Sequence, residues 1–179
     1  MSWFRHLLLW TGAALVVAVI AAYMLPRQVH VDRSITINAP REAVFERING
    51  YATFNQWSPW FDLDPNARYT YEGPAAGVGA KIIWVGDPST LGSGSQVITA
   101  SQAGERVAAD VDFGQGSLAK QVITLAADGT GTKVTWGMDV DLGMNPLYRY
   151  FGLGFDGMIG KDFDKGLANL KRVVESQGR

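Results

Sequence analysis

The 179-residue sequence contains no cysteine and only two histidines. Without cysteine the chain cannot form a disulfide, a thiolate metal site or a thiol nucleophile. Its 16 basic and 17 acidic residues leave a net charge of -1, so it lacks the basic excess that nucleic-acid-binding proteins carry. We therefore expect no nucleic acid partner, and we expect any partner to be recognised by shape and apolar contact.

Motifs for catalysis or cofactor binding are also scarce. No spacing typical of zinc or calcium ligands occurs, so we expect no metal and no cofactor. Residues 152–157 match GxGxxG, but no strand–helix–strand unit surrounds them. Asp110 and Asp112, like Asp139 and Asp141, alternate with apolar residues, which predicts that these acids face water. Because no catalytic residue is identified, the sequence favours a binding protein over an enzyme.

The N-terminal segment has a composition unlike the rest of the chain. Residues 7–25 read LLLWTGAALVVAVIAAYML and carry no charge. A membrane-spanning helix needs about 20 apolar residues, whereas the apolar region of a cleavable signal has roughly 7–15. We therefore expect residues 1–27 to form a retained single-pass anchor and residues 28–179 to form the globular domain. The alternatives are a signal peptide cut near residues 18–22 and a buried soluble helix.

The basic residues that flank this segment bear on its orientation in the membrane. Arg5, His6 and the α-amino group favour a cytoplasmic N-terminus, whereas Arg27 and Arg33 favour the opposite orientation. We expect the globular domain to lie outside the cytoplasm, in a periplasm-type compartment. The absence of cysteine is compatible with an oxidising compartment of this kind.

After the anchor, the pattern predicts a strand, a short helix, a series of strands and a long helix. Alternating apolar residues predict the first strand over residues 29–37, and Pro40 and Glu42 suit the first turn of a helix that ends near Gly50. Short strands joined by turns, with Asp128-Gly129 as a hairpin signal, imply an antiparallel meander. The further strands are expected near residues 69–71, 82–85, 96–100, 107–113, 121–125 and 133–141.

The C-terminal segment predicts one amphipathic helix of roughly 30 residues, because apolar residues recur at intervals of four or three from Leu147 to Val174. Glycine destabilises a helix interior, yet this segment has glycine at positions 152, 154, 157, 160 and 166. We therefore expect close backbone approach or a kink there. A curved sheet holding such a helix in its concave face leaves room for a cavity.

Several motifs occur in an order and spacing that resemble a known family. They are SITINAPREAVFERI at 34–48, WSPW at 57–60, GVGAKIIWVGD at 77–87, GSG at 92–94, GTKVTWGMDV at 131–140 and GKDFDKGLANLKRVVE at 160–175. Together they resemble the START-like SRPBCC superfamily, and most closely its polyketide cyclase/dehydrase branch. The resemblance implies an α+β helix-grip fold, a curved antiparallel sheet wrapped around a long C-terminal helix, preceded here by one transmembrane helix.

The same resemblance places the segment after the first helix at the mouth of a cavity. Trp57 and Trp60 would then form an apolar lip, with Pro59 fixing the turn between them. The rival interpretation is that the two tryptophans plug one end of the core. Asp62 and Asp64 lie nearby at the expected rim, where acids in a loop most often stabilise a turn.

The cavity lining is expected to be aromatic. Each lining residue has packing in the core as its alternative. We expect a membrane-anchored protein that binds a hydrophobic small molecule or lipid. The alternatives are a cyclase or dehydratase that acts on a polyketide-like substrate, and a regulatory partner of a membrane complex that binds no ligand. The candidate ligand-binding residues are Trp57, Trp60, Tyr71 (or Tyr69 on the same face), Trp84, Phe113, Trp136, Met138, Phe155, Ile159 and Phe163.

Overall fold

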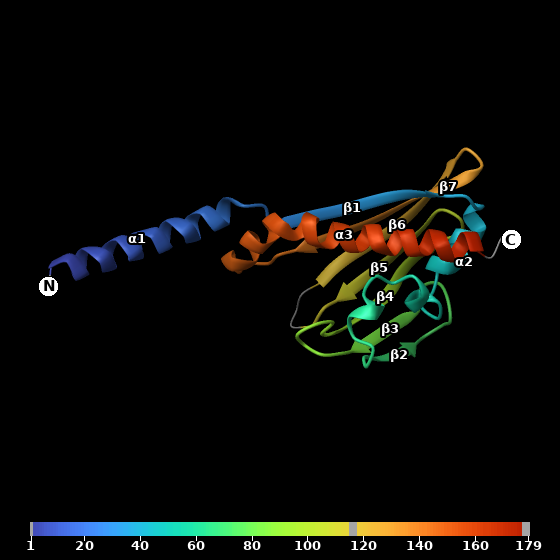
Figure 1. Ribbon diagram of the computed structural model, residues 1–179, viewed down its shortest axis with the longest axis horizontal. Coiled ribbons are helices and arrows are strands. Elements are labelled where there is room, and N and C mark those ends of the chain that lie inside the picture. Colours follow the sequence, from blue (N-terminus) through green and yellow to red (C-terminus); the bar gives the residue numbers. More distant parts are fainter. Residues whose placement is uncertain (1, 115–117, 177–179) are drawn as a thin grey trace.

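The computed structural model describes residues 2–114 and 118–176. Helix α1 (Ser2–Met24) projects from one end of a domain in which helix α3 (Pro146–Ser176) lies along one face of a sheet (Figure 1). The short helix α2 (Arg41–Ile48) and two 3-10 turns, η1 (Phe54–Gln56) and η2 (Phe61–Leu63), connect the first two strands. This arrangement confirms the predicted α+β helix-grip fold with an apolar helix before it.

The described residues form a seven-stranded antiparallel sheet with the order β1-β7-β6-β5-β4-β3-β2. Strands β2 to β7 follow one another as a meander, and β1 joins at the side of β7. The predicted meander is therefore confirmed. The strands are β1 (Gln28–Ile37), β2 (Arg68–Glu72), β3 (Lys81–Val85), β4 (Ser93–Gln102), β5 (Arg106–Asp112), β6 (Leu118–Asp128) and β7 (Gly131–Asp141).

The two faces of the sheet differ as the strand alternation predicts. Along β7, Val134, Trp136 and Met138 are buried, whereas Asp139 and Asp141 between and beyond the buried positions are exposed. The same holds along β5, where the side chains of Asp110 and Asp112 are exposed. The four acids face water on the outer side of the sheet, as expected.

The glycines of α3 fall into two groups. A Cβ added to Gly166 would lie 2.6 Å from Cζ3 of Trp136 and 3.1 Å from Cδ of Pro59, and one added to Gly160 would collide with the guanidinium of Arg33. The predicted close approach is thus confirmed at these positions. Gly154, in contrast, would meet nothing within 4 Å.

Arg33 interrupts the apolar series of β1 because it pairs with α3. Its Nη1 donates to Oδ1 of Asp156 at 2.9 Å, its Nη2 donates to Oδ2 at 3.1 Å, and its Nε lies 3.6 Å from Oδ2 of Asp164. The guanidinium occupies the space left by Gly160. A charged side chain therefore fits on the helix-facing side of the sheet, since both its charge and its volume are accommodated.

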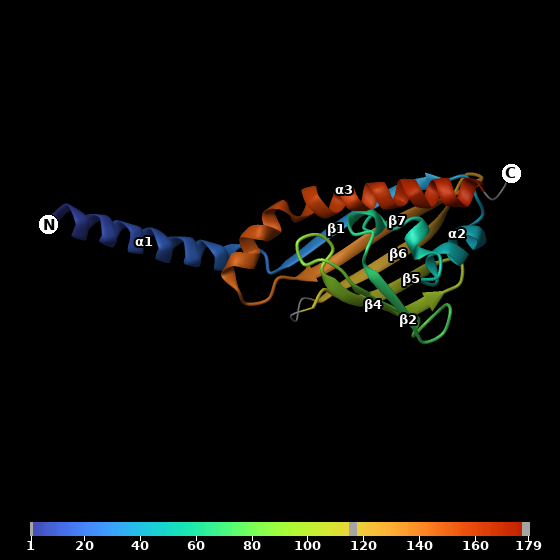
Figure 2. The same ribbon diagram turned by 60° about the horizontal axis from the view of Figure 1, so that its bottom comes forward.

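Helix α1 carries a segment, Trp3–Met24, that is long and apolar enough to cross a membrane. Only 6% of its most apolar window is buried inside the protein, so the helix does not form part of the core. A signal sequence near the N-terminus can also be long and apolar enough to meet this criterion. At its end α1 meets the first turns of α3, which bend toward it (Figure 2).

Candidate ligand-binding cavity

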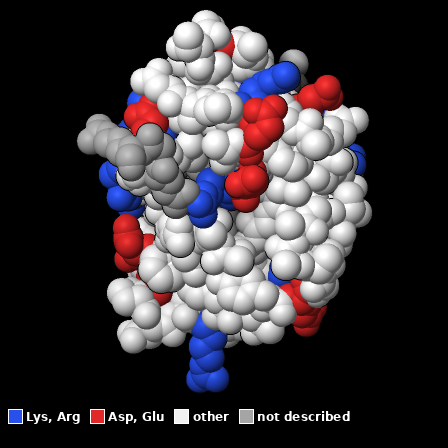
Figure 3. Space-filling view, turned by 90° about the vertical axis from the view of Figure 1, so that its right-hand side faces the viewer, with Lys and Arg blue, Asp and Glu red and all other residues white. Residues whose placement is uncertain are grey.

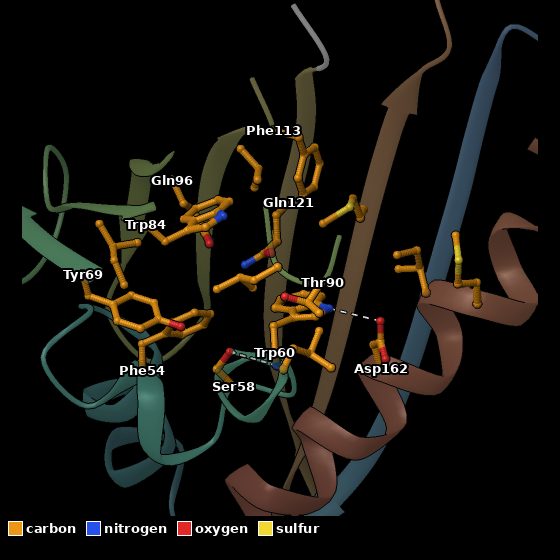
Figure 4. Close-up of a pocket in the computed structure, with 17 residues that line it drawn as sticks. Phe54, Ser58, Trp60, Tyr69, Trp84, Thr90, Gln96, Phe113, Gln121 and Asp162 are labelled. Carbon is orange, nitrogen blue, oxygen red and sulfur yellow. Dashed lines mark hydrogen bonds between the residues drawn. The ribbon is translucent and has the colours of Figure 1, made fainter. Parts of the chain in front are cut away.

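A cavity of about 270 Å³ lies between the sheet, α3 and the segment that follows α2. Twelve of its lining side chains are aromatic or aliphatic and five are polar, which is typical of a site for a small apolar molecule. Figure 4 shows the aromatic side chains gathered around it from these elements. The lining comprises Phe54, Ser58, Trp60, Leu63, Tyr69, Ile82, Trp84, Thr90, Leu91, Gln96, Val111, Phe113, Gln121, Met138, Met158, Ile159 and Asp162.

Two tryptophans of the lining are held in place by their neighbours. Trp84 on β3 lies opposite Gly94 on β4, and a Cβ at that glycine would come within 2.5 Å of Cζ2 of the indole. Trp60 donates from Nε1 to Oδ2 of Asp162 on α3 at 3.1 Å, and its backbone N–H donates to Oγ of Ser58 at 3.3 Å (Figure 4). These contacts fix two of the aromatic side chains of the cavity wall, and side chains fixed in this way lose little entropy when a ligand binds.

Three further aromatics close one side of the cavity as packed core. The rings of Trp136 and Phe163 stack with centroids 4.2 Å apart and planes at 7°, and Trp57 meets Trp136 edge-on at 5.4 Å. All three are at most 2% exposed. Trp57 therefore fills the core, as the rival interpretation held, whereas Trp60 lines the cavity.

The structure places the predicted site residues in three settings. Five line the cavity, and Phe155 lines an adjoining groove. Tyr71 is 49% exposed on the edge strand β2, and Tyr69, two residues earlier on the same face, lines the cavity in its place. Trp57, Trp136 and Phe163 are core residues. That these residues bind a ligand stays a prediction. The five in the cavity are Trp60, Trp84, Phe113, Met138 and Ile159.

Two glutamines in the cavity wall were not predicted. Gln96 on β4 and Gln121 on β6 are each only 5% exposed, and Oε1 of Gln121 has no hydrogen-bond partner among the described residues. Buried polar atoms are nearly always hydrogen-bonded, because an unpaired one costs about 1–3 kcal/mol. Gln121 lies at an inward position between Ala119 and Ile123, and a polar residue at such a position is a signal that the sequence does contain.

The ionisable groups around the cavity offer little for proton transfer. Burial raises the pKa of the Tyr69 hydroxyl, and the nearby charge of Asp64 raises it further, so this phenol is protonated near neutral pH. The carboxylate in the lining is that of Asp162, which accepts the Trp60 hydrogen bond. Among the described residues, no group of three or more histidine or acidic side chains could hold a metal ion.

The acids beside the expected mouth stabilise loops. Asp64 accepts hydrogen bonds from the backbone N–H of Asn66 at 3.0 Å and of Asp87 at 2.7 Å. Asp62 lies 3.6 Å from Nζ of Lys165 on α3. Asp64 therefore agrees with the expectation that an acid in such a loop serves a turn, whereas Asp62 contacts α3 instead.

A groove of about 620 Å³ adjoins the cavity at the end of the domain near α1. It lies between the ends of β5 and β7 and the first turns of α3, and residues 140–145 form much of one side. Phe113 and Ile159 line both hollows. These two side chains therefore stand between the groove and the interior cavity.

Comparison with protein families gives a match over residues 28–175. The matching model describes polyketide cyclase / dehydrase and lipid transport proteins. No curated protein matches the chain. The matched range covers the whole sheet and nearly all of α3, and it excludes α1.

Solved structures share this fold at low sequence identity. The protein CV1439 from Chromobacterium violaceum is 18% identical, with a TM-score of 0.53 over 84% of this chain and 99% of that one. SA2116 from Staphylococcus aureus, of unknown function, is 13% identical, with a TM-score of 0.64 over 84% and 96%. The di-domain ARO/CYC StfQ from the steffimycin biosynthetic pathway is 9% identical, with a TM-score of 0.63 over 84% and 52%. At these identities the likeness establishes the fold alone.

Proposed function

Since the chain belongs to the polyketide cyclase / dehydrase and lipid transport family, we propose that it is a membrane-anchored binding protein for a hydrophobic small molecule or lipid. The observation that carries this proposal is the ordered, mostly apolar cavity between α3 and the sheet. In this proposal residues 1–27 are the membrane anchor and residues 28–179 are the binding domain. The domain lies outside the cytoplasm, in a periplasm-type compartment.

The ligand contacts would come from the aromatic and aliphatic side chains of the cavity. Trp60 and Trp84 have fixed positions, and Phe113, Met138 and Ile159 complete the apolar surface. Burying apolar surface contributes roughly 25 cal/mol per Å², so a ligand that fills the cavity gains most of its affinity from these contacts. The other predicted residues lie outside the cavity lining and would support its shape without contacting the ligand. They are the core residues Trp57, Trp136 and Phe163, Tyr71 on the edge strand, and Phe155 in the groove.

Gln121 contributes a hydrogen-bond acceptor to the cavity lining. Its Oε1 is an acceptor without a partner among the described residues, deep in an apolar wall. A ligand hydroxyl or N–H placed against this oxygen would satisfy it. We therefore assign the ligand one hydrogen-bond donor on an otherwise apolar body.

A cyclase or dehydratase acting on a polyketide-like substrate is the alternative, supported by the fold shared with the ARO/CYC protein StfQ. Such an enzyme needs a group that moves protons in the cavity. The carboxylate of Asp162 is the acid in the lining, and it is engaged by Trp60. The binding function therefore has the stronger support.

The test is to purify the full-length protein from its own membranes in mild detergent and to identify co-purifying molecules by organic extraction and mass spectrometry. Phe113→Arg places a charge between the groove and the cavity, whereas Leu118→Arg changes an exposed residue on the neighbouring strand β6 that lines neither hollow. We expect a discrete apolar molecule with the wild type and the Leu118 variant, and its loss with the Phe113 variant. A ligand-free protein that takes up nothing from a panel of lipids and polyketides would favour the regulatory-partner alternative.

Gln121→Leu separates binding from folding. Removing a buried acceptor without a partner should leave stability unchanged or raise it by about 1 kcal/mol, because its desolvation cost disappears. Ligand affinity should fall by roughly tenfold, which corresponds to one lost hydrogen bond. If binding is unchanged and the protein loses stability, Gln121 serves the fold and not the ligand. Turnover of a bound molecule by the wild type, lost in Asp162→Asn, would establish the enzyme alternative.

A further inference from the structure

The first half of α3 and the loop before it expose an unusual set of apolar side chains. Exposed fractions lie between 54% and 72%, and the one charged residue between positions 142 and 155 is Arg149. Patches of this kind on a soluble domain mark an interaction surface. We call this set the apolar foot; it consists of Met144, Leu147, Tyr148, Phe151 and Leu153.

Arg149 turns away from the foot surface and fastens it to α1. Its Nη1 donates to the carbonyl oxygens of Tyr23 at 3.0 Å and Leu25 at 3.2 Å, and its guanidinium lies 5.1 Å from the centre of the Tyr23 ring. A cation at a helix C-terminus satisfies carbonyls that lack intrahelical partners. The foot is therefore held at the end of α1, and its single cation is directed at the carbonyl oxygens there and not at the foot surface.

A second bond fixes how far the foot reaches along α1. The hydroxyl of Tyr150 donates to the carbonyl oxygen of Ala18 at 2.6 Å. Ala18 precedes the end of α1 at Met24 by six residues, or about 9 Å of helix. Amphipathic helices in the membrane interface lie about 5–10 Å deep, so the foot has the depth of an interfacial segment if α1 spans the bilayer.

The chemistry of this end of the domain fits a bilayer surface. Tyr23 and Tyr150 link the C-terminal part of α1 to the start of α3, where Tyr148 is exposed, and tyrosine is enriched at membrane–water interfaces. Just beyond them Arg27 pairs with Asp141 at 2.7 Å, which begins the charged part of the domain. The opposite end carries interspersed acidic and basic side chains (Figure 3).

We propose that the apolar foot is a second membrane contact, which lies in the interfacial layer beside α1 and opens the adjoining groove toward the bilayer. Tyr148 and Phe151 belong both to the foot and to the groove, and the groove meets the cavity at Phe113 and Ile159. A membrane-borne ligand then passes between bilayer and cavity without crossing water. This inference rests on the proposed anchoring of α1.

The absence of cysteine makes a direct test straightforward, because a single introduced cysteine carries the only label. Full-length Phe151→Cys and Leu147→Cys are labelled with an environment-sensitive fluorophore and reconstituted into phosphatidylcholine vesicles. Val78→Cys is the matched control, since Val78 is a 59% exposed apolar residue in the loop between β2 and β3. Val16→Cys, in the middle of α1, reports on the anchor itself.

Labels at positions 147 and 151 should lose about half of their fluorescence to lipids with a nitroxide near the headgroup and resist iodide in the water, as expected for interfacial side chains. The label at position 78 should be quenched by iodide and should keep its fluorescence with nitroxide lipids. If position 16 is quenched by deep nitroxide lipids while positions 147 and 151 behave like 78, the foot inference is overturned and the anchor stands. If position 16 is also quenched by iodide, the anchor proposal fails. Protection of positions 147 and 151 from both quenchers would show that protein covers the foot, and would overturn the inference.

Discussion

The two halves of α3 have similar side chains in opposite surroundings. In the second half Phe163, Leu167 and Leu170 are at most 1% exposed, whereas in the first half Leu147 and Phe151 are 64% and 72% exposed. The apolar spacing runs through both halves, but the large apolar side chains that are fully buried all lie in the second. The difference teaches that helical periodicity identifies an apolar face and does not identify what covers it.

The largest test of this comparison removes one phenylalanine from each half. Phe163→Ala should lower the free energy of unfolding by about 3–5 kcal/mol, because it leaves a cavity beside Trp136 in a closed core. Phe151→Ala should change it by no more than about 0.5 kcal/mol in detergent solution, because the side chain is exposed. Denaturant unfolding followed by circular dichroism measures both. Equal losses would mean that the first half is packed as tightly as the second.

A second pair of variants compares glycines. Gly166→Ala should destabilise the protein by about 1–3 kcal/mol, because the new methyl group would press on Trp136 and Pro59, both of which are buried. Gly154→Ala meets nothing within 4 Å and should stabilise α3 by about 0.5–1 kcal/mol through helix propensity. The same unfolding measurement checks the signs. Effects of the same sign at both positions would contradict the difference in packing between these two glycines.

The smallest expected effect concerns the ion pair at the border between the halves. The hydrogen bond from Arg33 lowers the pKa of Asp156 below its ordinary value of 3.8, so the folded state binds this proton less readily than the unfolded state. The stabilisation is therefore complete above about pH 4 and is lost as the pH falls through the lowered folded value. Because the Asp156 carboxylate is exposed, the effect is small and weakens with salt.

Asp156→Asn should accordingly lower the denaturation midpoint near neutral pH, and the gap to the wild type should narrow as the pH falls through the lowered pKa of Asp156. Asp110→Asn, on the exposed outer face of β5, is the control for the removal of one exposed carboxylate. A gap that stays constant with pH would mean that the carboxylate charge contributes nothing at this border.

Which face a residue occupies could be predicted from the sequence, but its depth in the structure could not. Trp136 and Met138 share one face of β7, yet Trp136 stacks on Phe163 while Met138 lines the cavity. The alternation of apolar residues in a strand does not show where α3 packs against the sheet. That place depends on contacts between distant segments, such as those of Gly166 with Trp136 and Pro59. The predicted order of elements needed no such information, and it is confirmed.

Tyr69 and Gln121 illustrate two other limits. Tyr69 and Tyr71 have the same alternation, and only the position of β2 at the sheet edge decides which of them the cavity reaches. The apolar residues of β6 predict the strand but assign no role to Gln121. A glutamine at an inward position is visible in the sequence, but only the surrounding walls show that its oxygen lacks a partner.

The link between α1 and the sheet is short. Helix α1 ends at Met24 and β1 begins at Gln28, which leaves residues 25–27 as the connection. Three residues reach at most about 11 Å. Arg149 donates a hydrogen bond to the carbonyl oxygen of Leu25, the first residue of this connection. With α1 in a bilayer, the near end of the domain is held within about 11 Å of that surface, and the domain cannot travel to another membrane. It would bind and release its ligand at one membrane, and any acceptor of that ligand would have to come to this membrane.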